Sequence, residues 1–233
     1  MTNSTDRVAV VTGGSLGIGA EISNQLLDLG WTVHVLARHA DAYVGAEHER
    51  CRIHNVDVRD VTAVNVTAQR VAQAIGDNQL DALILCAGIG YPTPLPTVTR
   101  DHYDELFNTN VAGSIFCTQA FAPLLREGEG VIAVISSIAG RRGFADWSLY
   151  CAAKHALEGF TASIRDELRP KRIRVTSIQP GSVDTPSYDH LSAAEKSDFM
   201  DPATVAALTV HAIRLPPQAC VETMFVNNAV GDL

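Results

Sequence analysis

The sequence predicts an α/β fold, a single-domain doubly wound parallel sheet of about seven strands flanked by helices. Short apolar runs alternate along the 233 residues with segments whose apolar side chains recur at helical spacing, which is typical of βαβ units. The run "DALILCAG" at 81–88 is apolar at nearly every position, as expected when helices cover both faces of a sheet. No repeat, low-complexity tract or linker divides the chain, so we expect one domain over residues 1–233.

The first half of the chain opens with a strand, a glycine turn and a helix. The run "RVAVVTGG" at 7–14 reads as a buried strand. Ile18, Ile22 and Leu26 then share one helical face before Gly30 ends that helix. By the same patterns, further strands are predicted at 31–38, 50–58 and 81–88, and a helix at 61–75.

Proline marks the boundaries in the second half. The stretch "IGYPTPLPTVT" at 89–99 holds three alternating prolines and is predicted to be a loop. Segment 182–200 is polar, and we expect it to be mobile. Asp201 resembles an N-cap followed by proline at the first helical position, and the proline pair at 216–217 ends that helix. The remaining predicted elements are helices at about 101–125, 148–168 and 203–215, and strands at 130–137, 173–181 and 221–228.

The composition argues against several classes of partner. With 18 Lys and Arg against 26 Asp and Glu, the net charge is −8, so we expect no binding to nucleic acid or to anionic membranes. The opening "MTNSTDR" has no apolar core and no apolar run reaches membrane-spanning length, so we expect no signal peptide and a cytoplasmic protein. The five cysteines include no C-x-x-C pair, which favours free thiols and predicts no metal site.

A glycine loop joins the first predicted strand to the first helix. In "TGGSLGIG", Gly13, Gly17 and Gly19 let the chain turn sharply and let an anion approach the backbone without meeting a Cβ atom. The amides and dipole of the helix N-terminus attract a pyrophosphate there. The predicted contacts of this loop are Gly13, Ser15, Leu16, Gly17, Ile18 and Gly19.

Three motifs together resemble those of the short-chain dehydrogenase/reductase family in its compact form. They are Gly13-x-x-x-Gly17-x-Gly19, Ser137 and Tyr150-x-x-x-Lys154, in the right order and on the right elements. The likeness covers nearly the whole chain. It implies a Rossmann fold, a nicotinamide dinucleotide, a small-molecule carbonyl or alcohol substrate, and assembly as a homodimer or homotetramer.

The second predicted strand indicates which dinucleotide is bound. NAD-preferring Rossmann proteins carry an acidic residue near its end, about 20 residues past the loop, to bind the ribose hydroxyls. Here Ala37 stands at that place and Arg38 follows, which suits a 2′-phosphate and predicts NADP(H) over NAD(H). Leu16 argues the other way, because many NADP-dependent relatives carry a basic residue within the glycine loop.

The resemblance implies further cofactor contacts. Leu85 and Cys86 depart from the family's Asn-Asn-Ala-Gly motif, which removes two side-chain amides but leaves the small Ala-Gly pair. The positions implied to contact the dinucleotide are Asp57, Val58, Ala87, Gly88, Tyr150, Lys154, Pro180, Gly181, Val183 and Thr185.

Tyr150 and Lys154 carry the predicted proton chemistry. A free phenol is a poor base because its pKa is near 10, but a neighbouring ammonium lowers that pKa. A spacing of four residues brings the two side chains together on one helical face. The pair would then donate a proton in reduction and accept one in oxidation.

Two further catalytic residues are implied by the resemblance. Ser137 corresponds to the family's serine that hydrogen-bonds the substrate oxygen. Asn110, which precedes Gly113 in "NTNVAGSIF", corresponds to an asparagine that interrupts a helix and holds a water in a proton relay to the lysine; Asn108 is the rival position.

The sequence predicts an NADP(H)-dependent oxidoreductase that interconverts a carbonyl and an alcohol, with its substrate open. Arg141 and Arg142 could meet a carboxylate or phosphate on the substrate. The alternatives are therefore a 3-oxoacyl-carrier-protein reductase or a 3-hydroxy-acid dehydrogenase. A dinucleotide-binding sensor without catalysis is a third. Possible apolar walls of the substrate pocket are Tyr91, Phe144 and Trp147.

Overall fold

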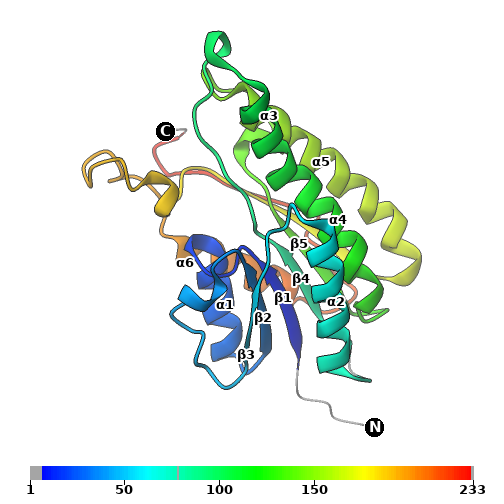
Figure 1. The fold of residues 1–233 in the computed structure, drawn as a ribbon. Coiled ribbons are helices and arrows are strands. Elements are labelled where there is room, and N and C mark those ends of the chain that lie inside the picture. The colour runs from blue at the N-terminus through cyan, green and yellow to red at the C-terminus, as the bar shows by residue number, and fades with distance from the viewer. Residues whose placement is uncertain (1–6, 78, 232–233) are drawn as a thin grey trace.

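A computed structural model describes residues 7–77 and 79–231 and shows one parallel sheet of seven strands (Figure 1). The strand order is β3-β2-β1-β4-β5-β6-β7, so the direction of winding reverses between β1 and β4. Ligands bind at such a switch point in open α/β sheets. The strands are β1 (Val8–Thr12), β2 (Thr32–Ala37), β3 (Cys51–Asn55), β4 (Ala82–Leu85), β5 (Val131–Ile135), β6 (Arg174–Pro180) and β7 (Thr223–Val226). The predicted doubly wound parallel sheet is confirmed.

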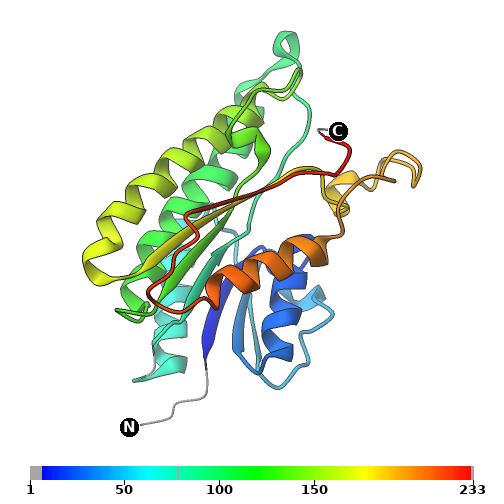
Figure 2. The ribbon, with the colours of Figure 1, turned by 180° about the vertical axis from the view of Figure 1, so that it is seen from behind.

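Helices cover both faces of the sheet (Figures 1 and 2). α1 and α6 pack together on one face, and α2, α4 and α5 lie on the other. The α-helices are α1 (Gly17–Asp28), α2 (Val61–Ile75), α3 (Arg100–Phe107), α4 (Gly113–Phe121), α5 (Ser148–Leu168) and α6 (Pro202–Ile213). Asp201 caps α6 by accepting a hydrogen bond from the Ala203 amide, as predicted.

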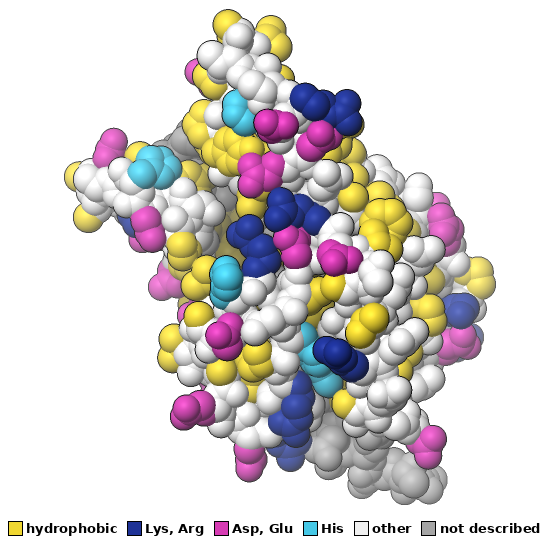
Figure 3. All heavy atoms as spheres, viewed as in Figure 1, with side chains coloured by type: hydrophobic (Ala, Val, Ile, Leu, Met, Phe, Trp, Pro, Cys, Tyr) yellow, Lys and Arg dark blue, Asp and Glu magenta, His cyan; other side chains and the backbone are white. Residues whose placement is uncertain are grey.

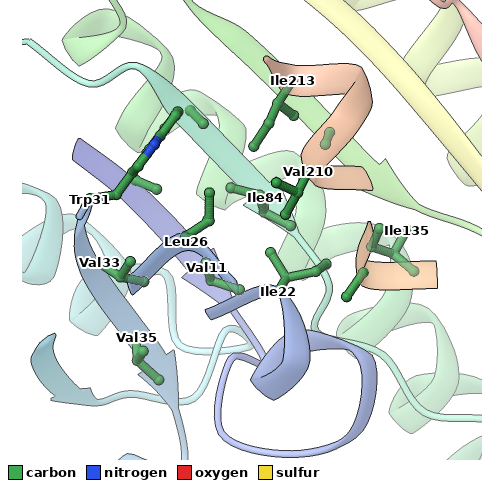
Figure 4. Close-up of a cluster of buried hydrophobic side chains, with 14 of the residues drawn as sticks. Val11, Ile22, Leu26, Trp31, Val33, Val35, Ile84, Ile135, Val210 and Ile213 are labelled. Carbon is green, nitrogen blue, oxygen red and sulfur yellow. The ribbon is translucent and has the colours of Figure 1, made fainter. Parts of the chain in front are cut away.

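Each face of the sheet has its own apolar core. Figure 4 shows the core under α1 and α6, where Ile22 and Leu26 of α1 meet strand residues such as Val11 and Ile84. Ile22 and Leu26 are fully buried, and a buried side chain of this kind stabilises the fold by about 1.5–3 kcal/mol. This packing fixes the glycine loop between β1 and α1 at the switch point.

The predicted helix at about 101–125 is not one regular helix. α3 and α4 are joined by a π-helical segment, Asn108–Ala112, and a short 3-10 turn follows α4. The interruption expected at Asn110 is therefore present.

Residues 1–6, from which the absence of a signal peptide was inferred, lie outside the described part of the chain. Within 7–77 and 79–231, no helix is both long and apolar enough to cross a membrane. Those same residues bring together no group of three or more His, Cys, Asp or Glu suited to a metal ion.

Candidate active site

A cavity of about 670 Å³ opens at the carboxyl ends of the strands. It is lined by residues from the glycine loop, the ends of β2 to β6, and the start of α5. All the predicted catalytic residues line it, and so do all the predicted cofactor contacts except Gly19. The predicted residues along its wall are Gly13, Ser15, Leu16, Gly17, Ile18, Arg38, Asp57, Val58, Ala87, Gly88, Asn110, Ser137, Tyr150, Lys154, Pro180, Gly181, Val183 and Thr185.

The glycine loop has the geometry of an anion cradle. Gly13 has φ +63°, and a Cβ atom there would lie 2.8 Å from the Ala87 Cα. Gly19 lies beneath the loop, where a Cβ atom would collide with the Gly13 carbonyl oxygen. The first turn of α1 has no side-chain cap and no acidic residue, so its amides remain available to an anion. These features fit the pyrophosphate of a dinucleotide.

Ser137 follows β5 and is oriented by its own turn. Its Oγ accepts a hydrogen bond from the Ala139 amide over 3.1 Å. Because the oxygen is engaged as acceptor, the hydroxyl proton remains to be donated. The Ser137 side chain also acts on the Tyr150 phenol and lowers its pKa.

Tyr150 lies in the first turn of α5, and its ring packs edge-on against Trp147 with 5.6 Å between centroids. Burial raises the pKa of its phenol above 10, and the Ser137 hydrogen bond only partly opposes this. The expectation that Lys154 holds this pKa below its usual value is therefore wrong for the structure as described. The phenol is protonated at neutral pH, which is the form that donates a proton.

Lys154 lies one turn further along α5 and is 5% exposed. Its Nζ donates a hydrogen bond to the Ile135 carbonyl over 3.1 Å and stands 5.7 Å from the centroid of the Tyr150 ring. Burial lowers the pKa of the ammonium to about 8, while Cys86 and the Glu158 carboxylate oppose that shift. The lysine can thus carry or lose its charge near neutral pH.

Asn110 sits in the π-helical segment and is 1% exposed. Its Nδ2 donates to the carbonyls of Leu106 and Ile89, both over 2.9 Å. Its Oδ1 accepts from the Ile89 amide over 3.2 Å. The side chain therefore joins the helix to the segment after β4. The exposed Asn108, the rival position, makes none of these contacts.

Comparison with known families decides what kind of protein this is. A sequence model described as short chain dehydrogenase matches residues 7–196. The chain belongs to the short chain dehydrogenase family.

Relatives and solved structures agree with this assignment. Sepiapterin reductase of Chlorobaculum tepidum is 28% identical, covering 97% of this chain and 98% of that protein. The 2-dehydro-3-deoxy-L-rhamnonate dehydrogenase (NAD(+)) of a Sphingomonas species is 31% identical, covering 83% of this chain and 78% of that protein. The crystal structure of a metagenomic short-chain oxidoreductase in complex with NADP is 29% identical, with a TM-score of 0.82 and coverage of 96% and 97%. The chain is an oxidoreductase that acts on CH–OH groups, and it uses a dinucleotide cofactor.

This short chain dehydrogenase departs from the expected Asn-Asn-Ala-Gly motif, and Thr12 compensates locally. The Thr12 Oγ1 accepts hydrogen bonds from the Cys86 and Ala87 amides, each over 3.1 Å. This fixes the backbone that faces Gly13. Leu85 is 2% exposed and packs in the core, so no side chain there can reach a cofactor. Sequence reasoning missed Thr12, because its partners lie more than 70 residues away.

The end of the cavity beside Arg38 carries a second arginine that sequence reasoning missed. Arg59 lines the cavity with Arg38 and pairs with Asp57 over 2.6 Å. This hydrogen-bonded pair, together with the charge of Arg38, holds the pKa of the Asp57 carboxyl below its usual range. Figure 3 shows basic side chains beside acidic ones near the middle of this face.

Three residues predicted near the substrate do not line the cavity. Arg141 donates to the Gln179 amide oxygen over 3.5 Å, and its guanidinium lies 5.2 Å from the centroid of the Phe225 ring. Arg142 lies over the Phe144 ring, 4.4 Å from its centroid. Tyr91 donates a hydrogen bond to Glu105 over 2.8 Å. Of the predicted apolar walls, Phe144 and Trp147 do line the cavity.

Segment 182–200 contributes more than its polar sequence indicated. Tyr188, Leu191 and Phe199 line the cavity from this segment. Both of its ends are held by Asn228, which bonds the Ser182 backbone and the Asp198 carbonyl. The sequence signal for this role was the few apolar residues scattered among many polar ones.

Proposed function

We propose that this short chain dehydrogenase is an NADP(H)-dependent enzyme that interconverts a ketone or aldehyde with an alcohol. The observation that carries the proposal is the convergence of Ser137, Tyr150 and Lys154 in one cavity beneath the glycine loop. When bound, the nicotinamide supplies or accepts the hydride. The substrate is a small molecule, and the protein is inferred to be a cytoplasmic homodimer or homotetramer.

Each catalytic residue has a distinct role in this proposal. Ser137 donates a hydrogen bond to the substrate oxygen and stabilises the charge that develops there. Tyr150, protonated at neutral pH, gives its proton to that oxygen in reduction and takes one back in oxidation. The Lys154 ammonium and the positive end of the α5 dipole stabilise the phenolate left behind. Asn110 holds the wall between the π-helical segment and Ile89 in place.

The preference for NADP(H) is supported by charge at the adenosine end. Ala37 offers no carboxylate to a ribose, and Arg38 and Arg59 line the cavity beside it. Guanidinium groups bind phosphate more strongly than they bind hydroxyls. One relative is named for NAD(+) and one similar structure is named for NADP, so the experiment must compare both cofactors.

The test measures kcat/KM with NADPH and NADH on a panel of aldehydes and ketones. NADPH should be favoured, and Arg38→Ala should lose at least about tenfold in kcat/KM with NADPH while changing little with NADH. Tyr150→Phe should abolish reduction and keep the Kd for NADPH. Preference for NADH would refute the cofactor assignment, and near-full turnover by Tyr150→Phe would refute the catalytic one. If no carbonyl is reduced while NADPH binds, the sensor alternative replaces the enzyme.

A further inference from the structure

The cavity has two chemically different ends. Arg38 and Glu105 act on the Asp57–Arg59 pair, so these four charged lining side chains lie near one another at the adenosine end, and Lys154 belongs to the catalytic group. Beyond Tyr150, the wall is built by two segments, 138–147 and 182–200. None of the lining residues that these two segments contribute is charged. Their large lining side chains are Ile138, Phe144, Trp147, Tyr188, Leu191 and Phe199.

Aromatic rings from both segments line the same cavity as Tyr150. Trp147 packs edge-on against Tyr150 with 5.6 Å between ring centroids. Tyr188 comes from segment 182–200 and lines the cavity together with Tyr150. Burial raises the pKa of the Tyr188 phenol, and a charge on the nearby Tyr150 raises it further. Phe199 supports Tyr188 edge-on, with 5.0 Å between centroids. A flat apolar group next to the reacting carbonyl would meet aromatic rings contributed by both segments.

The wall on the Tyr188 side is held in place from outside the cavity. Lys196 and Asp184 form an ion pair over 2.6 Å across the segment, so these two charges are satisfied away from the substrate. Val183 and Met200 form a parallel bridge, and Asn228 bonds the backbone at both ends of the segment. The rings therefore form a largely preformed surface, and ordering them on binding costs little.

We infer that the substrate is an uncharged carbonyl compound with an aromatic or similarly flat apolar group beside the carbonyl, and that Tyr188 determines this specificity. The inference rests on the proposed function and narrows its substrate. A carboxylate next to the carbonyl would lie among uncharged and largely apolar side chains. Neither Arg141 nor Arg142 lines the cavity, so its wall offers a carboxylate no arginine of that loop. The 3-hydroxy-acid alternative is therefore disfavoured.

Three ligands separate the effects of charge and of the ring. Methyl benzoylformate is aromatic and neutral, benzoylformate is aromatic and charged, and methyl pyruvate is neutral without a ring. Each Kd is measured by calorimetry on the Tyr150→Phe variant loaded with NADP⁺, which cannot reduce a ketone. We expect methyl benzoylformate to bind at least about tenfold more tightly than methyl pyruvate and about 100-fold more tightly than benzoylformate. Turnover of the same compounds by the wild-type enzyme with NADPH should follow the same order.

Variants of Tyr188 test the residue. Tyr188→Ala should raise the Kd for methyl benzoylformate about tenfold and the Kd for methyl pyruvate much less. Tyr188→Phe keeps the ring and should restore most of the lost affinity. Tyr103→Ala removes a 40% exposed tyrosine from α3 and is the matched control, with no change expected. An unchanged Kd for NADP⁺ shows that each variant is folded.

The outcomes distinguish this inference from the proposed function. Equal or tighter binding of benzoylformate, or an unchanged Kd for methyl benzoylformate in Tyr188→Ala, overturns the inference. Turnover of benzoylformate in preference to its ester leaves the oxidoreductase in place and overturns the substrate class. If the expected order of Kd values holds while no ketone is reduced, the proposed reaction fails and the ligand class stands.

Discussion

The Asn110 side chain pairs with the backbone of Ile89 in both directions. Its Nδ2 donates to the Ile89 carbonyl over 2.9 Å, and its Oδ1 accepts from the Ile89 amide over 3.2 Å. The same Nδ2 also satisfies the Leu106 carbonyl within the helix. One buried amide thus stabilises both the π-helical segment and the wall of the active site that follows β4.

Asn110→Ala should therefore damage stability as well as activity. The change removes the partner of the buried Leu106 carbonyl and of the part-buried Ile89 amide and carbonyl, which costs about 1–3 kcal/mol. Urea unfolding followed by circular dichroism measures the loss. Asn108→Ala, at an exposed position two residues earlier, should stay within about 0.5 kcal/mol of wild type. Equal stability of the two variants would contradict a structural role for Asn110.

Lys154 should set an alkaline limit on carbonyl reduction. Its ammonium has a pKa lowered by burial to about 8, so the charge that stabilises the Tyr150 phenolate is lost as the pH rises through that value. The Glu158 carboxylate raises this pKa, so Glu158→Gln should move the alkaline fall in kcat/KM to lower pH. The glutamine keeps an oxygen for the hydrogen bond that the Ser177 hydroxyl donates over 2.7 Å.

The pH profile of kcat/KM for reduction, measured from pH 6 to 10, tests whether Glu158→Gln moves the alkaline fall to lower pH. Glu167→Gln, which is exposed near the far end of α5, is the control and should keep the wild-type profile. A Glu158→Gln profile that coincides with wild type would show that the carboxylate does not act on Lys154.

The motifs that could be predicted from the sequence are those whose chemistry is local. The spacing of Gly13, Gly17 and Gly19 and of the Tyr150–Lys154 pair maps directly onto one turn and one helix. The sign of the Tyr150 pKa shift could not be predicted, because it depends on how deeply the fold buries the ring.

Residues that act through long-range contacts were also missed. Thr12 accepts hydrogen bonds from amides just after β4, more than 70 residues away, and Asn228 binds a segment at least 30 residues before it. A pattern of apolar and polar residues contains no information on such pairs. The π-helical segment was predicted in part. The resemblance indicated a break in the helix at Asn110, but only the structure shows the contact with Ile89 that explains the break.

His34 should make the protein sensitive to mild acid. It is 2% exposed on β2, with its Nδ1 3.0 Å from the His54 Nε2, and its pKa is lowered to about 4, mainly by burial. In the unfolded chain the pKa returns to about 6.5, so the unfolded state binds the proton first as the pH falls. Stability is complete above pH 6.5 and should decline by roughly 3 kcal/mol toward pH 4.

His34→Gln should flatten this dependence, because glutamine can still bond His54 and does not titrate. Urea midpoints at pH 7 and pH 5 measure the slope, and His211→Gln on the exposed side of α6 should keep the wild-type slope. An unchanged slope in His34→Gln would place the acid sensitivity elsewhere.

Asn228 should control how firmly segment 182–200 closes the cavity. Its side chain accepts from the Ser182 amide over 2.8 Å and donates to the Ser182 and Asp198 carbonyls over 2.9 and 2.8 Å. Asn228→Ala removes all three bonds, and we expect the segment that carries Tyr188 to open more often. The KM for ketones should rise about tenfold while the Kd for NADPH changes little.

Trypsin provides a second readout of the same motion, because Lys196 lies within the segment and is held by Asp184. Cleavage after Lys196 should be several-fold faster in Asn228→Ala, and Asn65→Ala, an exposed position on α2, should match wild type in both measurements. Faster cleavage without a change in KM would mean that the segment opens without serving the substrate. If neither the KM nor the cleavage rate changes, the Lys196–Asp184 ion pair and the Val183–Met200 bridge hold segment 182–200 without Asn228.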